Sequence, residues 1–92
     1  MALYKEVRQK SDVIATYHRI SKIILIPKNN AEVTVASYLS EDARQLNKAP
    51  LVVKNYTWGY DRWGYGYENN YGISAFYELL KELPEYYSAI DT

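Results

Sequence analysis

The first sixty residues contain several short runs in which apolar, often β-branched side chains alternate with polar ones, and this pattern limits the fold more than any other feature of the chain. A period of two residues places successive side chains on opposite faces of a strand. The run 13–26 has mixed faces as far as residue 20 and is apolar on both faces from residue 23, and a bulge or a bend near Ser21 and Lys22 would reconcile the two halves. We predict strands over 3–7, 13–26, 31–39 and 51–58.

Turn and capping signals separate these runs. Pro27-Lys28-Asn29-Asn30 predicts the turn of a β-hairpin between 20–26 and 33–39, because proline presets one backbone angle and asparagine tolerates the left-handed region. Ser40, followed by two acidic residues, predicts an N-capped helical turn over 40–46.

The C-terminal part contains the clearest helical pattern. From Ile73 onward, with Ser74 as a cap, apolar residues recur at the spacing of one helix face, and Pro84 ends or kinks the helix before a last turn over 85–90. The core-facing residues of this helix are Phe76, Leu79, Leu80 and Leu83.

These elements predict a small α+β fold. Ninety-two residues are too few for two independently cored units, so residues 1–92 form a single domain. We expect an antiparallel sheet of three to five strands, arranged as a meander, with the C-terminal helix packed on one face.

Residues 59–72 break this regularity. The segment contains all four glycines of the chain and five aromatic residues. Because glycine at this density opposes a helix, we predict an extended loop or a hairpin with a glycine-containing turn.

Composition excludes several function classes. Eleven Lys and Arg balance eleven Asp and Glu along the chain, which argues against nucleic acid or an anionic membrane as a partner. The absence of cysteine excludes disulfides, thiolate metal sites and cysteine nucleophiles. The start lacks the apolar core of a signal peptide and no apolar run could cross a bilayer, so we expect a soluble protein that is not secreted.

Reactive side chains are few. His18, the only histidine, lies within a predicted strand, where we expect a half-exposed structural residue. The carboxylates Asp61 and Glu68 have no spacing typical of a calcium loop. We therefore predict no enzyme activity, no catalytic residue, no metal site and no cofactor.

Recognition is the remaining hypothesis. Eleven tyrosines against one phenylalanine suit contact surfaces, because a tyrosine ring is apolar and its hydroxyl is polar. Aromatic residues mixed with Gly, Asn and Arg are typical of binding surfaces, although such rings also enlarge small cores or stack on sugars. The predicted interaction residues are Trp58, Tyr60, Arg62, Trp63, Tyr65, Tyr67 and Tyr71.

Short phrases along the chain resemble small proteins encoded in the tail-gene clusters of long-tailed bacteriophages and prophages, mostly of Gram-positive hosts. None of these phrases is a catalytic motif, so the resemblance lies in the order of short sequence segments along the chain. The phrases are Met1-Ala2-Leu3-Tyr4-Lys5, Tyr17-His18-Arg19-Ile20, Val33-Thr34-Val35-Ala36-Ser37-Tyr38-Leu39-Ser40, Ala43-Arg44, Tyr56-Thr57-Trp58 and Leu80-Lys81-Glu82-Leu83-Pro84-Glu85-Tyr86, with Ala89 and Asp91.

The resemblance implies a non-enzymatic structural or accessory protein of a tail or its distal tip. It would work as a homo-oligomer, with a trimer or hexamer suiting tail symmetry, and contact other phage tail proteins. Two alternatives stay open: a glycan-binding adhesion module that uses the 58–71 aromatic loop on host cell-wall saccharide, and a tail-assembly chaperone absent from the virion. The location would be the virion tail, or the host cytoplasm during assembly.

Overall fold

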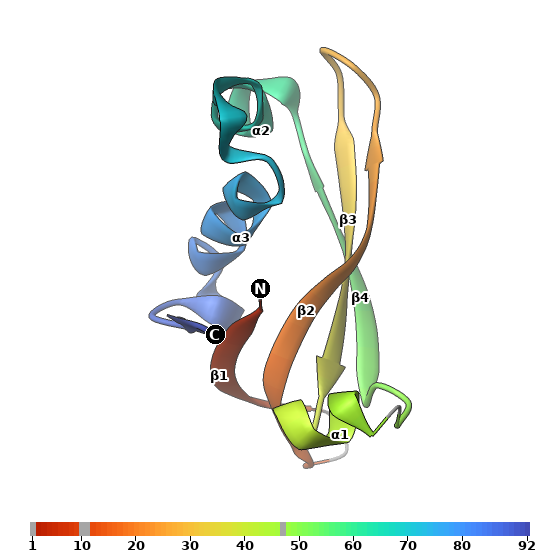
Figure 1. Ribbon diagram of the computed structural model, residues 1–92. Helices are drawn as coiled ribbons and strands as arrows, with labels where there is room; N and C mark the ends of the chain where they lie inside the picture. Colours follow the sequence, from red (N-terminus) through yellow and green to blue (C-terminus); the bar gives the residue numbers. More distant parts are fainter. Residues whose placement is uncertain (1, 10–11, 47) are drawn as a thin grey trace.

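The protein folds around one antiparallel sheet with helices on one face. The computed structural model describes residues 2–9, 12–46 and 48–92, without the side chains of Asn70 and Tyr71. The strand order is β4-β3-β2-β1-β5, and this confirms the predicted small α+β fold (Figure 1). The strands are β1 (Leu3–Arg8), β2 (Ile14–Leu25), β3 (Ala31–Tyr38), β4 (Val52–Trp58) and β5 (Ile90–Asp91).

The helices after β4 form the second layer. They stack along one face of the sheet and leave the other face uncovered over most of its length (Figure 1). The layer consists of α2 (Tyr60–Gly66), the π-helical turn η1 (Tyr67–Tyr71), α3 (Ile73–Lys81) and the 3-10 turn η2 (Pro84–Tyr86).

No helix in the described ranges is long and apolar enough to cross a membrane.

The bulge expected in the long second strand is present. Ile20 pairs with Val35 and Lys22 pairs with Thr34, so Ser21 is an extra residue that no residue of β3 opposes. After the extra residue, the side chains of β2 that would have faced the helical layer face the open side of the sheet, and the reverse. This explains why the sequence of β2 shows no single apolar face. The hairpin between β2 and β3 is thereby confirmed.

The hairpin turn differs from the expectation in one detail. Lys28, not an asparagine, adopts the left-handed conformation, with φ of 56°. The turn closes where the amide of Asn29 donates to the carbonyl of Ile26 at 2.9 Å. Proline at position 27 suits the first central position of the turn, and the positive φ at the next position is the one that a type II turn has.

The core lies between the sheet and the helical layer. Phe76, Leu79 and Leu80 are buried and Leu83 packs against them, which confirms the apolar face of α3.

Ser40 caps α1 (Glu41–Gln45) as predicted, since its hydroxyl accepts from the amide of Ala43 at 3.2 Å.

Glycine, not serine, stands at the start of α3. Gly72 is the N-cap, with φ of 53°, and no side chain caps the helix, so the prediction that Ser74 caps it is wrong. A φ in this region is strained for other residues, which explains a glycine between η1 and α3.

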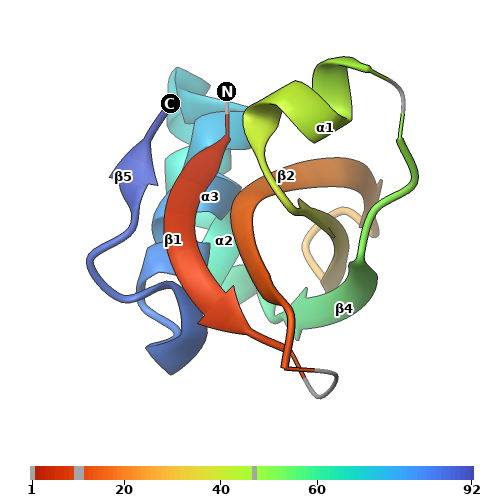
Figure 2. The ribbon, with the colours of Figure 1, turned by 90° about the horizontal axis from the view of Figure 1, so that it is seen from below.

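The C-terminus returns to the sheet. We predicted a helical turn over 85–90, but η2 ends at Tyr86 and β5 pairs with the start of β1. Reciprocal backbone bonds of 3.1 and 3.0 Å join Ala2 and Thr92, so the two ends of the chain lie side by side (Figure 2).

The prediction of an extended loop over 59–72 is wrong. The segment forms α2 and η1, and it covers the upper end of the sheet in Figure 1. Gly64 has a packing reason, since a Cβ at this position would overlap the ring of Tyr60. Burial of the neighbouring Trp63 offsets the helical cost of glycine, which is about 1 kcal/mol per residue.

Candidate functional site

The predicted aromatic residues divide between core and surface. Trp63 is only 3% exposed, and its ring lies 5.1 Å from that of Tyr60 and 6.2 Å from that of Phe76. Its indole N–H donates to the carbonyl of Asn29 at 3.0 Å, which ties α2 to the tip of the β2–β3 hairpin. Trp63 therefore acts as a packing residue of the small aromatic core at this end of the molecule.

The other predicted residues surround this core. Trp58 and Tyr60 are half-buried, and Trp58 stacks on Tyr56 with ring centroids 6.1 Å apart. Arg62 is exposed and pairs with Glu82 at 3.1 Å. The side chain of Tyr71 lies outside the described part of the structure.

Two tyrosines of the segment face solvent. Tyr65 is 77% exposed and Tyr67 is 39% exposed, although Tyr67 also touches the edge of Trp63 at a centroid distance of 5.8 Å. Among the aromatic side chains of this segment that the structure describes, these two tyrosines are the most exposed, and the hypotheses of protein contact and of sugar stacking both stay open. Interaction through these residues stays a prediction.

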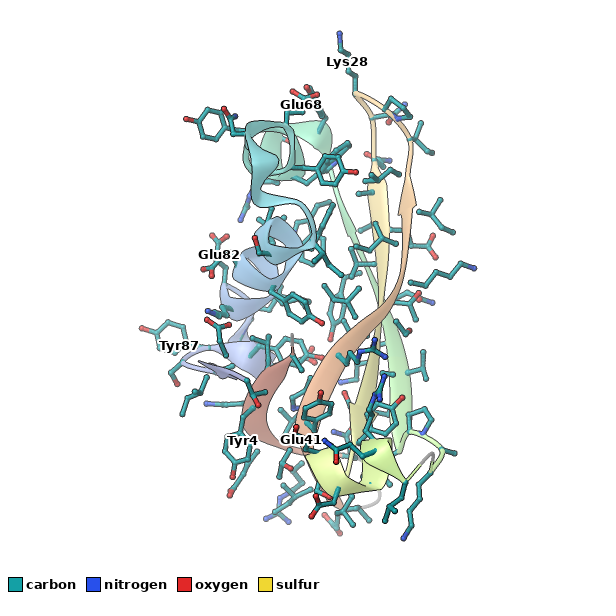
Figure 3. All side chains as sticks on the ribbon, viewed as in Figure 1. Tyr4, Lys28, Glu41, Glu68, Glu82 and Tyr87 are labelled. Atoms are coloured by element: carbon teal, nitrogen blue, oxygen red, sulfur yellow. The ribbon has the colours of Figure 1, made fainter. Side chains whose placement is uncertain are left out.

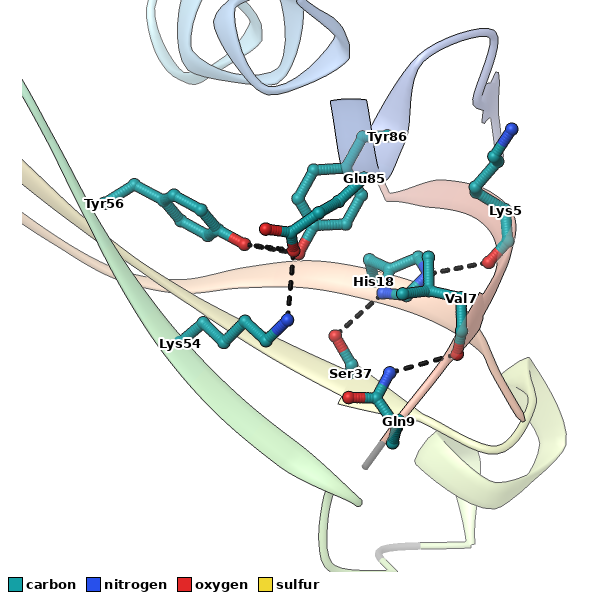
Figure 4. A network of polar contacts seen from close by, with 9 residues as sticks. All are labelled: Lys5, Val7, Gln9, His18, Ser37, Lys54, Tyr56, Glu85 and Tyr86. Carbon is teal, nitrogen blue, oxygen red and sulfur yellow. Dashed lines mark hydrogen bonds and ion pairs between the residues drawn. The ribbon is translucent and has the colours of Figure 1, made fainter. Parts of the chain in front are cut away.

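A buried polar network crosses the sheet at its lower end (Figure 4). His18 is 1% exposed, so the expectation of a half-exposed histidine is wrong. Its Nε2 lies 2.7 Å from the carbonyl oxygen of Lys5, and its Nδ1 lies 2.7 Å from the hydroxyl of Ser37. Because a carbonyl only accepts, Nε2 carries the proton and Nδ1 accepts from Ser37.

The network continues through phenols to the surface. The ring of Tyr86 packs edge-on against His18, and its hydroxyl lies 3.1 Å from that of Tyr56. Tyr56 donates to Glu85 at 2.9 Å, and Lys54 donates to the same carboxylate oxygen at 3.0 Å. Every buried side-chain nitrogen or oxygen in the described ranges has a hydrogen-bond partner.

The pKa shifts in the network follow from burial and from charge. Burial lowers the pKa of His18 below its ordinary value, so the imidazole is neutral at pH 7. Burial also raises the pKa of Tyr56 and of Tyr86. Burial opposes ionisation of Glu85, but the hydrogen bonds from Lys54 and Tyr56 outweigh it and hold the pKa of this carboxyl below its usual range.

The pair of Ser37 and His18 resembles a nucleophile with its base, but its position does not suit catalysis. Ser37 is 2% exposed, so a substrate would have to open the sheet to reach its hydroxyl. The network instead holds β1, β2, β3 and η2 together. The signal for it in the sequence was Ser37 itself, a polar residue in the same alternating face as Val33 and Val35.

The surface that the fold leaves without a partner is the edge and open face of the sheet. Among the residues that the structure describes, β4 pairs with β3 alone, and β5 covers only Leu3 and Tyr4 of β1 at the opposite edge. Val53 is 53% exposed and Ile24 is 44% exposed, and both lie on the face that the helical layer does not cover. The helical layer, by contrast, sends Glu82 and Tyr87 away from the sheet (Figure 3).

Comparison of the chain with protein-family models, with curated proteins and with solved structures found no match. The described residues contain no group of three His, Cys, Asp or Glu side chains placed to hold a metal ion.

Proposed function

We propose that the protein is a structural or accessory component of a bacteriophage or prophage tail, which works by self-association through the free edge of β4. The tail assignment depends on the resemblance of its short sequence phrases to small tail-module proteins. The mode of action depends on the sheet edge, which is the observation that carries the proposal.

The edge strand lacks the usual protection against pairing. Its side chains on the open face are Val53, Asn55 and Thr57, none of them charged, whereas natural edges often carry lysine or proline. A charged side chain on the covered face of an edge strand also opposes the addition of another strand when it has no counter-charge, and Lys54 occupies such a position. Glu85 neutralises that charge at 3.0 Å, so the edge stays open to another strand.

The two edges of the sheet differ from each other, and this favours a ring-shaped oligomer, in which one edge of each copy pairs with the other edge of the next copy. A contact between unlike surfaces closes into a ring when its rotation allows, whereas a contact between like surfaces gives a dimer. β4 is a seven-residue strand at one edge, and the other edge is β1 with the two-residue β5 beside its first residues. If pairing of β4 with β1 of the next copy closes into a ring, the ring is compatible with a trimer or hexamer, which suits tail symmetry better than a dimer.

Sedimentation velocity tests self-association. We expect an oligomer in the wild type at about 100 µM, and at least a tenfold weaker association in Val53→Lys, because a lysine on an edge strand opposes pairing. Ile73→Lys is the matched control, since it places the same charge at an exposed apolar residue of the helical layer. A monomeric wild type, or equal loss in both variants, would contradict the proposal.

Mass spectrometry of purified phage particles separates a tail component from an assembly chaperone. A tail component remains in the finished particle in a multiple of three copies. A chaperone is present in the infected cell and absent from the particle.

A further inference from the structure

A cavity of about 340 Å³ lies where the connection from α1 to β4 meets the open face of the sheet. Arg19 and Tyr38 enter it from β2 and β3, and Arg44 enters it from α1. Lys48, Ala49 and Pro50 of the connection also line it.

Three cations therefore line one cavity, and none of the described residues that line it is acidic. Four other cations of the described residues form ion pairs: Arg8 with Asp12, Lys54 with Glu85, Arg62 with Glu82, and Lys81 with two carboxylates. Within the described ranges, Arg19, Arg44 and Lys48 form no ion pair.

The acids of α1 do not balance this charge. Glu41 and Asp42 line a different cavity, which includes Tyr4 and Tyr17. Gathering like charges without a counter-charge is unfavourable, more so for side chains that are half-buried as Arg19 and Arg44 are. An anion bound among them would remove that cost.

We propose that this cavity binds a compact phosphate-bearing ligand, either free phosphate or a small phosphomonoester. The planar guanidinium groups of Arg19 and Arg44 suit bidentate bonding to phosphate oxygens, and Lys48 adds a third positive charge. The hydroxyl of Tyr38 is a further donor, and Ala49 with Pro50 offers an apolar wall to the body of a phosphomonoester. This site is separate from the free edge of β4.

Titration followed by ¹H–¹⁵N NMR in phosphate-free, low-salt buffer tests the site, with inorganic phosphate in one arm and glycerol 3-phosphate in the other. We expect saturable shifts of the amides that line the cavity. Arg19→Gln and Arg44→Gln should each weaken binding about tenfold, because each removes a charge-assisted, two-bond contact. The tighter of the two titrants identifies the source of the phosphate.

Matched controls separate a site from general charge screening. Lys22→Gln and Lys28→Gln each remove an exposed cation outside the cavity, and both should keep the wild-type affinity within twofold. Ala49→Glu leaves the three cations in place and adds a carboxylate to the wall, so it should abolish binding while the thermal unfolding midpoint stays unchanged.

Two results would overturn the proposal. The first is the absence of saturation in the NMR shifts, or an equal loss of affinity in the cavity variants and in the lysine controls. Either outcome would indicate that phosphate only screens the positive charges. The other is a single-stranded oligonucleotide that binds more than tenfold more tightly than either phosphate compound, since that would indicate a nucleic-acid surface.

Discussion

His18 couples the stability of the fold to pH. Burial lowers its pKa in the folded state, whereas the unfolded chain keeps the ordinary value near ~6.5. Between these two values the unfolded state binds more protons, so the free energy of unfolding should fall as the pH drops below about 6.5. Urea denaturation at pH 7.5 and pH 5.5 measures this fall.

His18→Gln provides the control for that measurement. Gln keeps a donor and an acceptor but does not titrate, so its unfolding free energy should be lower overall and nearly flat between the two pH values. Glu85 does not interfere between these two pH values. The pKa of its carboxyl is lowered in the folded protein, so the stability that it contributes is lost only as the pH falls below 4.5, the ordinary pKa of this carboxyl in the unfolded chain. An equal pH slope in wild type and variant would assign the effect to other groups.

Trp63 contributes packing and one hydrogen bond, and the two contributions can be separated. Trp63→Ala should lower the free energy of unfolding by about 3–5 kcal/mol, since it empties a buried site of the aromatic core. Trp63→Phe keeps a ring but leaves the carbonyl of Asn29 without its indole donor, so we expect a smaller loss. Tyr65→Ala, at a largely exposed ring, should change stability by less than ~0.5 kcal/mol in the same urea titration.

Two glycines of the helical layer should respond in opposite directions to the same substitution. Gly72 has φ of 53° and ψ of −136°, a conformation that a residue with a Cβ rarely adopts, so Gly72→Ala should destabilise the protein by about 1–3 kcal/mol. Gly66 has helical angles, φ of −64° and ψ of −44°, and lines a cavity of about 450 Å³, so Gly66→Ala should stabilise it by about 0.5–1 kcal/mol. Thermal unfolding of both variants tests whether α2 and η1 are helical in solution, because an extended loop would not give Gly66→Ala a stabilising effect.

The strands could be predicted from the sequence because their signal is local. Alternation along 51–58 places Lys54 and Tyr56 on the covered face, and the structure confirms this by their shared contact with Glu85. The helix α2 could not be predicted, because it makes contacts with distant parts of the chain, among them the hydrogen bond from Trp63 to Asn29, which is 34 residues away. Local glycine content predicts the opposite conformation.

The candidate sites depend even more on distant contacts. Arg19, Arg44 and Lys48 come together only after the bulge sets the face of β2 and α1 folds back beside β3. The network of His18 likewise joins β1, β2 and β3, and its ring packs on η2. Composition shows that these residues exist, but only the register of the sheet places them together.

The whole molecule is neutral, yet its charges are separated between the layers. Residues 1–58, which form α1 and all of the sheet but β5, contain nine Lys and Arg and five Asp and Glu. Residues 59–92, which form the helical layer and β5, contain two Lys and Arg and six Asp and Glu. One face of the molecule is therefore basic and the other is acidic.

This separation predicts the sign of the salt effect on self-association. Edge-to-edge pairing sets basic layer beside basic layer and acidic layer beside acidic layer, so it is opposed by repulsion that salt screens. We expect the association constant from sedimentation equilibrium to rise between about 50 and 500 mM NaCl, where the screening length falls from roughly 14 to 4 Å. If association instead weakens with salt, the acidic layer of one copy lies on the basic face of the next. That result would replace pairing at the edge of β4 with stacking of the two layers, while leaving self-association itself intact.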